Sequence, residues 1–373
     1  LSSIMSTALF SSFIILLMQT ALNKNAFLSK VELSVLLVVT HITAIRFLFP
    51  FDLPFMKNLI VKDIWPSIFI FLSDTEIRIA GYVISLSSIL LAIWLTGIIL
   101  LIFKEISSYC QLQTFIKNSA LQQNSRQTAY IDSIICLYKK RISYRLYITD
   151  QNISPIICGL KTPCIILPQS CLKNNFWMYA LEHEITHFFH GDLYLNFLYG
   201  IIYIVYWWNP FIYLLKRQRS RLLEMHVDSI VTRNMNPKEK TEYLESLLEV
   251  KRNCTSDKLK NISSVSFITN SSSDFSHRIK LIYKNLEGER KGFQKLFPLL
   301  LCSFAIIMCC SFFFIIEPYG IKPEDESISV EFTPETTYLI DNLDGTYDIY
   351  YNNIYFGTVT EIVEKDKAIK IYR

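Results

Sequence analysis

Glycine, histidine and paired cysteines are scarce in this chain of 373 residues. It contains 10 glycines and 6 histidines, and none of its 9 cysteines belongs to a C-x-x-C pair or follows Cys310. This spacing argues against a disulfide framework and fits a reducing compartment for the middle of the chain. The first apolar run has no basic leader and no A-x-A-type exit, which predicts an anchor rather than a cleaved signal peptide.

Apolar residues, in contrast, are abundant. They make up 51% of the chain, and the mean hydropathy of +0.28 predicts a mainly helical membrane protein. A helix needs about 20 residues to cross a bilayer. Arg46, near the end of one run, is expected to extend to the interface. Four transmembrane helices are predicted, the second shorter than the others, at Ile4–Leu22, Leu33–Phe49, Ile79–Phe103 and Leu296–Ile316.

The distribution of charge predicts the orientation of these helices. Lysine and arginine cluster between Lys104 and Lys295, as is typical of cytoplasmic flanks. The tail after Ile316 has 12 acidic and 5 basic residues, a net charge of 5 − 12 = −7. We therefore expect a membrane domain at 1–103, a cytoplasmic domain at 104–295, a fourth transmembrane helix at 296–316, and a small extracytoplasmic β-rich tail at 317–373.

The apolar segment 196–215 does not fit this simple scheme. It contains Trp207-Trp208-Asn209-Pro210, and proline breaks the helical hydrogen-bond ladder while tryptophan favours the membrane interface. A re-entrant or interfacial segment is therefore predicted. A fifth span remains the alternative, because hydropathy alone does not separate the two.

Periodicity and turn residues predict α+β structure in the middle of the chain. Residues 104–126 read as a polar helical linker, and 254–276 read as a loop rich in serine and asparagine. Short strands are expected at Arg145–Thr149, Pro155–Cys158 and Cys164–Leu167, and helices at Asn174–His190, Leu214–Arg233 and Pro237–Val250.

The most informative stretch is the H-E-x-x-H motif that begins at His183. Residues four apart lie on one face of a helix, so His183 and His187 can bind one metal ion. Glu184 then lies beside that ion and can take a proton from its bound water. Three of the six histidines fall between positions 183 and 190, which makes a chance match unlikely.

A catalytic zinc ion takes three protein ligands and leaves one position for water. Glu224 is predicted as the third ligand. Asp228, one helical turn later, is predicted to hold a ligand imidazole by its second nitrogen. His190 follows His187 on the same helix and does not easily complete a tetrahedron. His226 is a candidate for stabilising the transition state and equally an ordinary surface residue.

Taken together, these residues resemble the BlaR/MecR family of membrane metallopeptidases, the antibiotic-sensing signal transducers and their relatives. The likeness covers roughly residues 30–295 and is much more specific than H-E-x-x-H alone. It is carried by Arg46–Phe51, by Ser154-Pro155 with Gly159–Pro168, by His183–His187 with Gly191-Asp192, by Asn209-Pro210, and by Glu224-x-x-x-Asp228.

The resemblance implies a gluzincin-like zinc protease at the cytoplasmic face of a cell membrane, active in signal transduction by regulated proteolysis. Its substrate would be a protein or peptide, either the chain itself or a transcriptional repressor. Cys164–Leu167 is expected to hold this peptide by β-augmentation. The basic clusters suit anionic lipid rather than nucleic acid. A homodimer is left open.

One departure from the family concerns its sensor. Antibiotic sensors of this kind carry a penicillin-binding domain with Ser-x-x-Lys and Lys-Thr-Gly motifs, and neither motif occurs after Ile316. Two other functions remain as alternatives. One is a non-catalytic transducer that uses the fold as a scaffold, which the intact Glu184 disfavours. The other is a prenyl-protein-type membrane protease.

Overall fold

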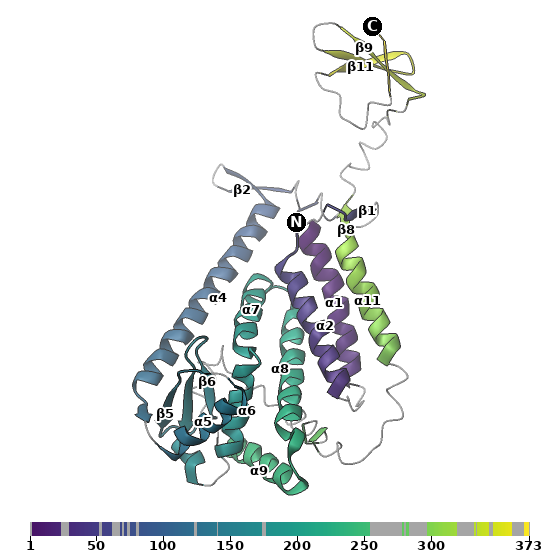
Figure 1. Ribbon diagram of the computed structural model, residues 1–373. Helices are drawn as coiled ribbons and strands as arrows, with labels where there is room; N and C mark the ends of the chain where they lie inside the picture. The colour runs from purple at the N-terminus through teal and green to yellow at the C-terminus, as the bar shows by residue number, and fades with distance from the viewer. Residues whose placement is uncertain are drawn as a thin grey trace. The chain divides into compact units, whose positions relative to one another are not determined.

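Figure 1 shows the chain as a computed structural model. It divides into two compact units, Leu1–Val61 with Leu72–Pro318, and Lys62–Phe71 with Tyr319–Arg373. The predicted loop 254–276 lies outside the described residues. The structure describes residues 2–23, 30–51, 54–61, 68, 71–72, 75–79, 82–122, 125–139, 141–173, 177–253, 278–279, 281–282, 297–318, 332, 334–342, 346–359 and 369–372.

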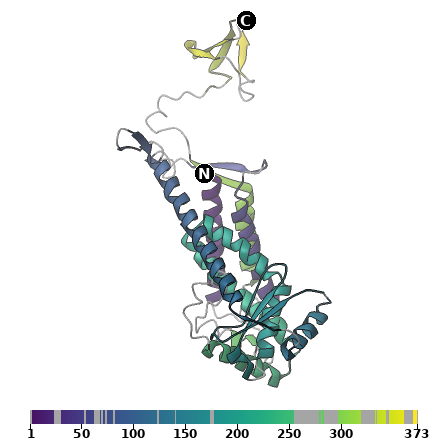
Figure 2. The same cartoon turned by 90° about the vertical axis from the view of Figure 1, so that its left-hand side faces the viewer.

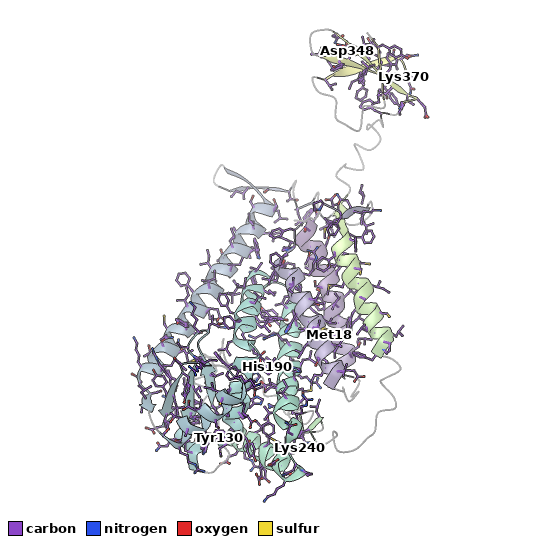
Figure 3. All side chains as sticks on the ribbon, in the orientation of Figure 1. Met18, Tyr130, His190, Lys240, Asp348 and Lys370 are labelled. Carbon is purple, nitrogen blue, oxygen red and sulfur yellow. The ribbon has the colours of Figure 1, made fainter. Side chains whose placement is uncertain are left out.

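Apolar helices form the first part of the larger unit (Figure 1). Among the described residues, α1 (Ser2–Asn23), α2 (Lys30–Leu48) and α4 (Leu86–Lys117) are long and apolar enough to cross a membrane. The fourth predicted span is the shorter apolar helix α11 (Phe297–Phe313). Met18, labelled in Figure 3, is fully buried among side chains of these helices and α8.

Arg46 lies between α2 and α11. Its side chain is buried, and its Nε donates to the carbonyl and the hydroxyl of Ser311, each at 3.1 Å. The ring of Phe312 lies beside the guanidinium. Helix α11 thus supplies hydrogen-bond acceptors for Arg46 where α2 ends, and the side chain joins the two helices.

The bounds of two predicted spans are corrected by the structure. Instead of a helix from Ile79, a hairpin of β2 (Glu76–Ile79) and β3 (Tyr82–Ser85) precedes α4, whose first turn is capped by the Ser85 hydroxyl. Instead of ending at Phe103, α4 continues to Lys117. The end of the fourth run is β8 (Phe314–Pro318), which pairs in parallel with β1 (Lys57–Val61).

A mixed sheet of order β4-β5-β7-β6 follows α4. The three predicted strands are present as β5 (Arg145–Thr149), β6 (Ile156–Cys158) and β7 (Cys164–Pro168), and α5 (Arg126–Leu137) covers them. The linker prediction missed β4 (Ala120–Gln122), which pairs with β5. Figure 2 shows the sheet and its surrounding helices from another side. The sheet shares an apolar core with α6 that includes Ile165, Leu167, Leu181 and Ile185.

The predicted substrate strand is also wrong. Residues Cys164–Leu167 lie in β7, which pairs with β5 on one side and β6 on the other. Over Cys164–Ile166 the strand therefore has a partner on each side and offers no free edge to a peptide. Among the described strands of this sheet, β6 is the edge strand beside β7.

The helices that follow bend once and then reverse the chain direction. Between α6 (Trp177–Phe189) and α7 (Asp192–Val205) the axis bends by 64°, at Gly191 with its left-handed φ of 77°. The chain then turns back, and Asn209 caps α8 (Pro210–Val231). Segment 196–215 is thus an antiparallel helical hairpin rather than one continuous helix, because Pro210 suits only the start of a helix (Figure 1).

The described part of the larger unit also contains two 3₁₀ turns and a further helix, at Gln169–Lys173 (η1), Thr232–Asn234 (η2) and Pro237–Asn253 (α9). The smaller unit contains a four-stranded sheet of order β11-β10-β9-β12. Asn352 and Asn353, with φ of 50° and 64°, form the tight turn between β10 and β11. The strands of this sheet are Thr337–Asp341 (β9), Tyr347–Tyr351 (β10), Ile354–Val359 (β11) and Lys370–Tyr372 (β12).

Candidate metal centre

Helix α6 presents the two histidines of the motif on one buried face. Its apolar residues pack under the sheet, so the face that carries His183 and His187 turns toward α8. The two side chains are buried, and their Nε2 atoms lie 3.2 Å apart. One point in space is therefore within reach of both imidazoles.

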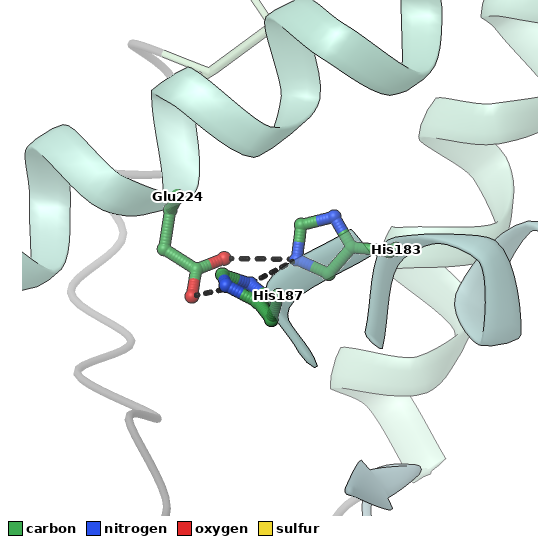
Figure 4. Close-up of side chains that lie close together, drawn as sticks. All are labelled: His183, His187 and Glu224. Atoms are coloured by element: carbon green, nitrogen blue, oxygen red, sulfur yellow. Dashed lines mark hydrogen bonds and ion pairs between the residues drawn. The ribbon is translucent and has the colours of Figure 1, made fainter. Parts of the chain in front are cut away.

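Glu224 of α8 completes this cluster (Figure 4). Its Oε2 lies 3.3 Å from Nε2 of His183, and its Oε1 lies 3.7 Å from Nε2 of His187. Tetrahedral zinc with bonds of about 2.0–2.2 Å places its ligand atoms about 3.3–3.6 Å apart. The observed separations are close to this spacing, and one ligand atom from each side chain lies within 4.8 Å of the other two, so the three side chains could hold one divalent ion.

Each histidine has its other nitrogen engaged by a neighbour. Nδ1 of His187 lies 2.7 Å from Oδ2 of Asp192, at the start of α7. Nδ1 of His183 lies 2.8 Å from the hydroxyl of Tyr243, on α9. A proton on Nδ1 leaves Nε2 free as a metal ligand, so both contacts favour the tautomer that a metal site needs.

Asp228 lies in the predicted place but makes a different contact. Its Oδ1 is 3.5 Å from Nδ1 of His183, and the Tyr243 hydroxyl donates to that same oxygen at 2.6 Å. The imidazole therefore donates to Tyr243, and Tyr243 donates to Asp228. Spacing along α8 could not reveal this relay, because Tyr243 comes from a separate helix.

Arg278 is the residue that sequence reasoning missed. Its Nε and Nη2 donate to the two oxygens of Asp228 at 2.6 and 2.8 Å, and its Nη1 lies 3.1 Å from Oε2 of Glu224. No local motif marks it, since it is 50 residues beyond Asp228 and follows the predicted loop.

Burial and neighbouring charges shift the pKa values of Glu184, Glu224 and His187. Burial raises the pKa of Glu184, against the opposing effect of His187 and His183. Burial also opposes the charged form of Glu224, but Arg278 and the imidazoles outweigh it and lower the pKa. For His187, burial is outweighed by Asp192 and the other carboxylates, which raise the pKa to about 9.

The remaining two histidines of this region lie outside the cluster. Nδ1 of His190 contacts the carbonyl of Thr186 at 2.8 Å. The ring of His226 packs edge-on to that of His190, with centroids 6.2 Å apart. Neither belongs to the group of three that could hold the ion among the described residues.

Comparison with known proteins places this cluster in a family. The model of the BlaR1 peptidase M56 family matches residues 75–282, more than half of the chain and all of the residues above from β2 to Arg278. The chain belongs to the BlaR1 peptidase M56 family. M56 is a peptidase family, and the His183–His187–Glu224 group agrees with a metal-dependent member.

Proteins similar to this chain include a methicillin resistance protein and two regulatory proteins. The chain is 25% identical over 233 residues to the methicillin resistance mecR1 protein of Staphylococcus aureus, and 28% identical over 229 residues to the regulatory protein BlaR1 of that organism. It is 24% identical over 168 residues to BlaR1 of Bacillus licheniformis. These matches cover 60%, 60% and 44% of this chain, but only 38%, 38% and 28% of the relatives.

Proposed function

We propose that the chain is a membrane-embedded, zinc-dependent endopeptidase that acts in regulated proteolysis. The observation that supports this most is the convergence of His183, His187 and Glu224 at the spacing of a tetrahedral ion. Imidazole and carboxylate ligands with a free fourth position are typical of catalytic zinc.

Glu184 is the general base in this proposal. Zinc held by the three side chains would lower the pKa of a bound water toward neutrality and polarise the scissile carbonyl. Glu184 lies beside the ligands on α6, and its raised pKa suits a group that first accepts a proton and then delivers it to the leaving amine. Asp192 and Tyr243 keep the imidazoles oriented throughout.

The edge strand β6 is the proposed place for the substrate backbone. It is short, it packs against α6, and its outer side has no partner among the described strands of its sheet. An extended peptide can add to such an edge through main-chain hydrogen bonds. The scissile bond would then pass close to the metal-binding face of α6.

The relatives suggest the biological setting. They are named as regulators and as a resistance protein, which supports a protein substrate, either a transcriptional repressor or the chain itself. The apolar helices and the basic middle segment support a multi-pass protein of the cell membrane with the peptidase domain in the cytoplasm and the tail outside. The α7–α8 hairpin then enters the membrane from the cytoplasmic side and returns.

The decisive experiment compares Glu184→Gln with the native chain in membranes. The variant should retain zinc, because Glu184 is no ligand, while cleavage of the substrate or of the chain falls by at least ~10² as is typical for loss of a general base. Glu182→Gln, two positions away on α6, is the matched control and should cleave normally. Normal processing by Glu184→Gln would favour the non-catalytic scaffold instead.

A further inference from the structure

Arg278 reaches the metal centre from outside the two helices that build it. Its segment packs on α8 and α9, where Ile282 is fully buried and Ile279 contacts the same apolar cluster of Val227 and Tyr243. The guanidinium side chain is mostly buried, with 13% of its surface exposed. The segment is thus held in place by apolar contacts that do not involve the charge.

The contacts of this guanidinium span two carboxylates of α8. Nε and Nη2 form a fork on Asp228, while Nη1 lies 3.1 Å from Glu224. The carboxylates are four positions apart on one helical face, where two like charges repel. Asp228 is fully buried, and a buried carboxylate without a cation costs several kcal/mol. One guanidinium therefore pairs with both carboxylates and reduces the repulsion between them.

Two of the three candidate ligands depend on this one side chain. Arg278 contacts Glu224 directly. It also fixes Asp228, whose carboxylate accepts a hydrogen bond from the Tyr243 hydroxyl. That hydroxyl in turn accepts a hydrogen bond from Nδ1 of His183. His187 is outside this chain of contacts, because Asp192 holds it.

We propose that Arg278 is a positioning residue of the metal centre, which sets the Glu224 carboxylate and, through Asp228 and Tyr243, the ring of His183. The proposal rests on the proposed metal site. The planar guanidinium contacts both carboxylates with three nitrogens in fixed positions. Lysine carries its charge on a single nitrogen and would not replace arginine here. The ion would then be bound by ligands that are less well preorganised.

The test measures zinc affinity of the purified full-length protein by competition with a chromophoric chelator. Arg278→Lys keeps the charge and loses the fork, and we expect its zinc affinity to fall by about 10–100-fold, as is usual for partners of metal ligands. Arg233→Lys, on the exposed turn after α8, is the matched control and should bind zinc as the native chain does.

A second variant guards against loss of folding. Replacing a buried ion pair on both sides by apolar residues is often neutral for stability. Arg278→Met with Asp228→Leu should therefore keep the unfolding midpoint of the metal-free protein near that of the native chain, yet bind zinc at least as weakly as Arg278→Lys. A merely structural role would lower the midpoint and leave the zinc affinity of the folded fraction unchanged.

Rescue by a small molecule makes the test sharper. Millimolar methylguanidinium should restore part of the zinc affinity of Arg278→Ala, and methylammonium should not. Native zinc affinity in both Arg278→Lys and the double variant would overturn the positioning role while leaving the metal site intact. Failure of the native chain itself to bind zinc would instead overturn the proposed function.

Discussion

At the scale of single residues, the second nitrogen of each histidine decides whether the cluster can bind metal. A ring with Nδ1 protonated offers Nε2 to the ion, and this state is held by different partners in the two rings. His187 relies on a carboxylate, Asp192, whereas His183 relies on a hydroxyl, Tyr243. The two rings should therefore respond differently to changes around them.

Asp192→Asn tests the carboxylate arm. The amide oxygen of asparagine can accept the hydrogen bond from Nδ1 of His187, but it lacks the negative charge of the Asp192 carboxylate. The amide can also flip and turn its NH2 group, a donor, toward the ring. We expect zinc affinity to fall by about 10–100-fold, measured by chelator competition. Asp132→Asn is the control, because Asp132 is exposed on α5 and its carboxylate accepts a hydrogen bond from the Tyr144 hydroxyl. An equal loss of zinc affinity in this control would contradict the role of Asp192.

How far the site could be predicted depended on sequence distance. The four-residue spacing of the two histidines is a local property, and helix periodicity places both on one face. Glu224 could be proposed because a zinc site needs a third ligand and because its spacing to Asp228 resembles the family. Tyr243 and Arg278 could not, because they lie 60 residues from His183 and 50 from Asp228, in helical sequence with no distinctive pattern.

At the scale of secondary-structure elements, the turn between α7 and α8 is fixed against α4 by two tryptophans. Trp94 donates to the Val205 carbonyl at 2.8 Å, and Trp207 donates to the Trp94 carbonyl at 3.3 Å. Gly97 lets the Trp207 ring lie directly on α4, because a Cβ at that position would be 2.3 Å from the ring. The absence of a side chain at Gly97 therefore positions the hairpin that leads to Glu224.

Gly97→Ala tests this contact. The added methyl group must displace a rigid indole, so we expect destabilisation of about 1–3 kcal/mol, the usual cost of overpacking. The measurement is thermal or denaturant unfolding in detergent. Gly200→Ala on α7 is the control, since nothing lies within 4 Å of the new Cβ, and its stability should be unchanged or higher. Equal effects of the two substitutions would contradict the packing argument.

Errors in element boundaries have a physical cause. Residues 79–85 continue an apolar run, and hydropathy does not distinguish the end of a hairpin rich in tyrosine, valine and isoleucine from the first turns of a helix. Likewise, β7 and β6 have similar composition. Which of them is the edge strand depends on pairing with β5, and composition carries no information about this pairing.

At the scale of the whole molecule, the account requires the peptidase domain and the tail to face opposite sides of the membrane. A membrane-impermeant maleimide tests this in intact cells. Cys136 of α5 is exposed and should react only after permeabilisation. Ile354→Cys, at an exposed position of a tail without native cysteines, should add a label in intact cells.

The reference for the first site is Cys136→Ser, which should lose only the share of the label that Cys136 carries in permeabilised cells, while other exposed cysteines such as Cys110 keep theirs. Labelling of both positions from the same side would contradict the proposed topology. It would leave the metal centre untouched, because the geometry of His183, His187 and Glu224 does not depend on the orientation of the membrane helices.

The central claim is that three side chains bind one zinc ion. X-ray absorption at the zinc edge of the purified full-length chain tests it directly. We predict a first shell of nitrogen and oxygen alone, with two imidazoles and bonds of about 2.0–2.2 Å, and loss of one oxygen neighbour in Glu224→Ala. Sulfur at about 2.3 Å, or an identical spectrum in Glu224→Ala, would contradict the account.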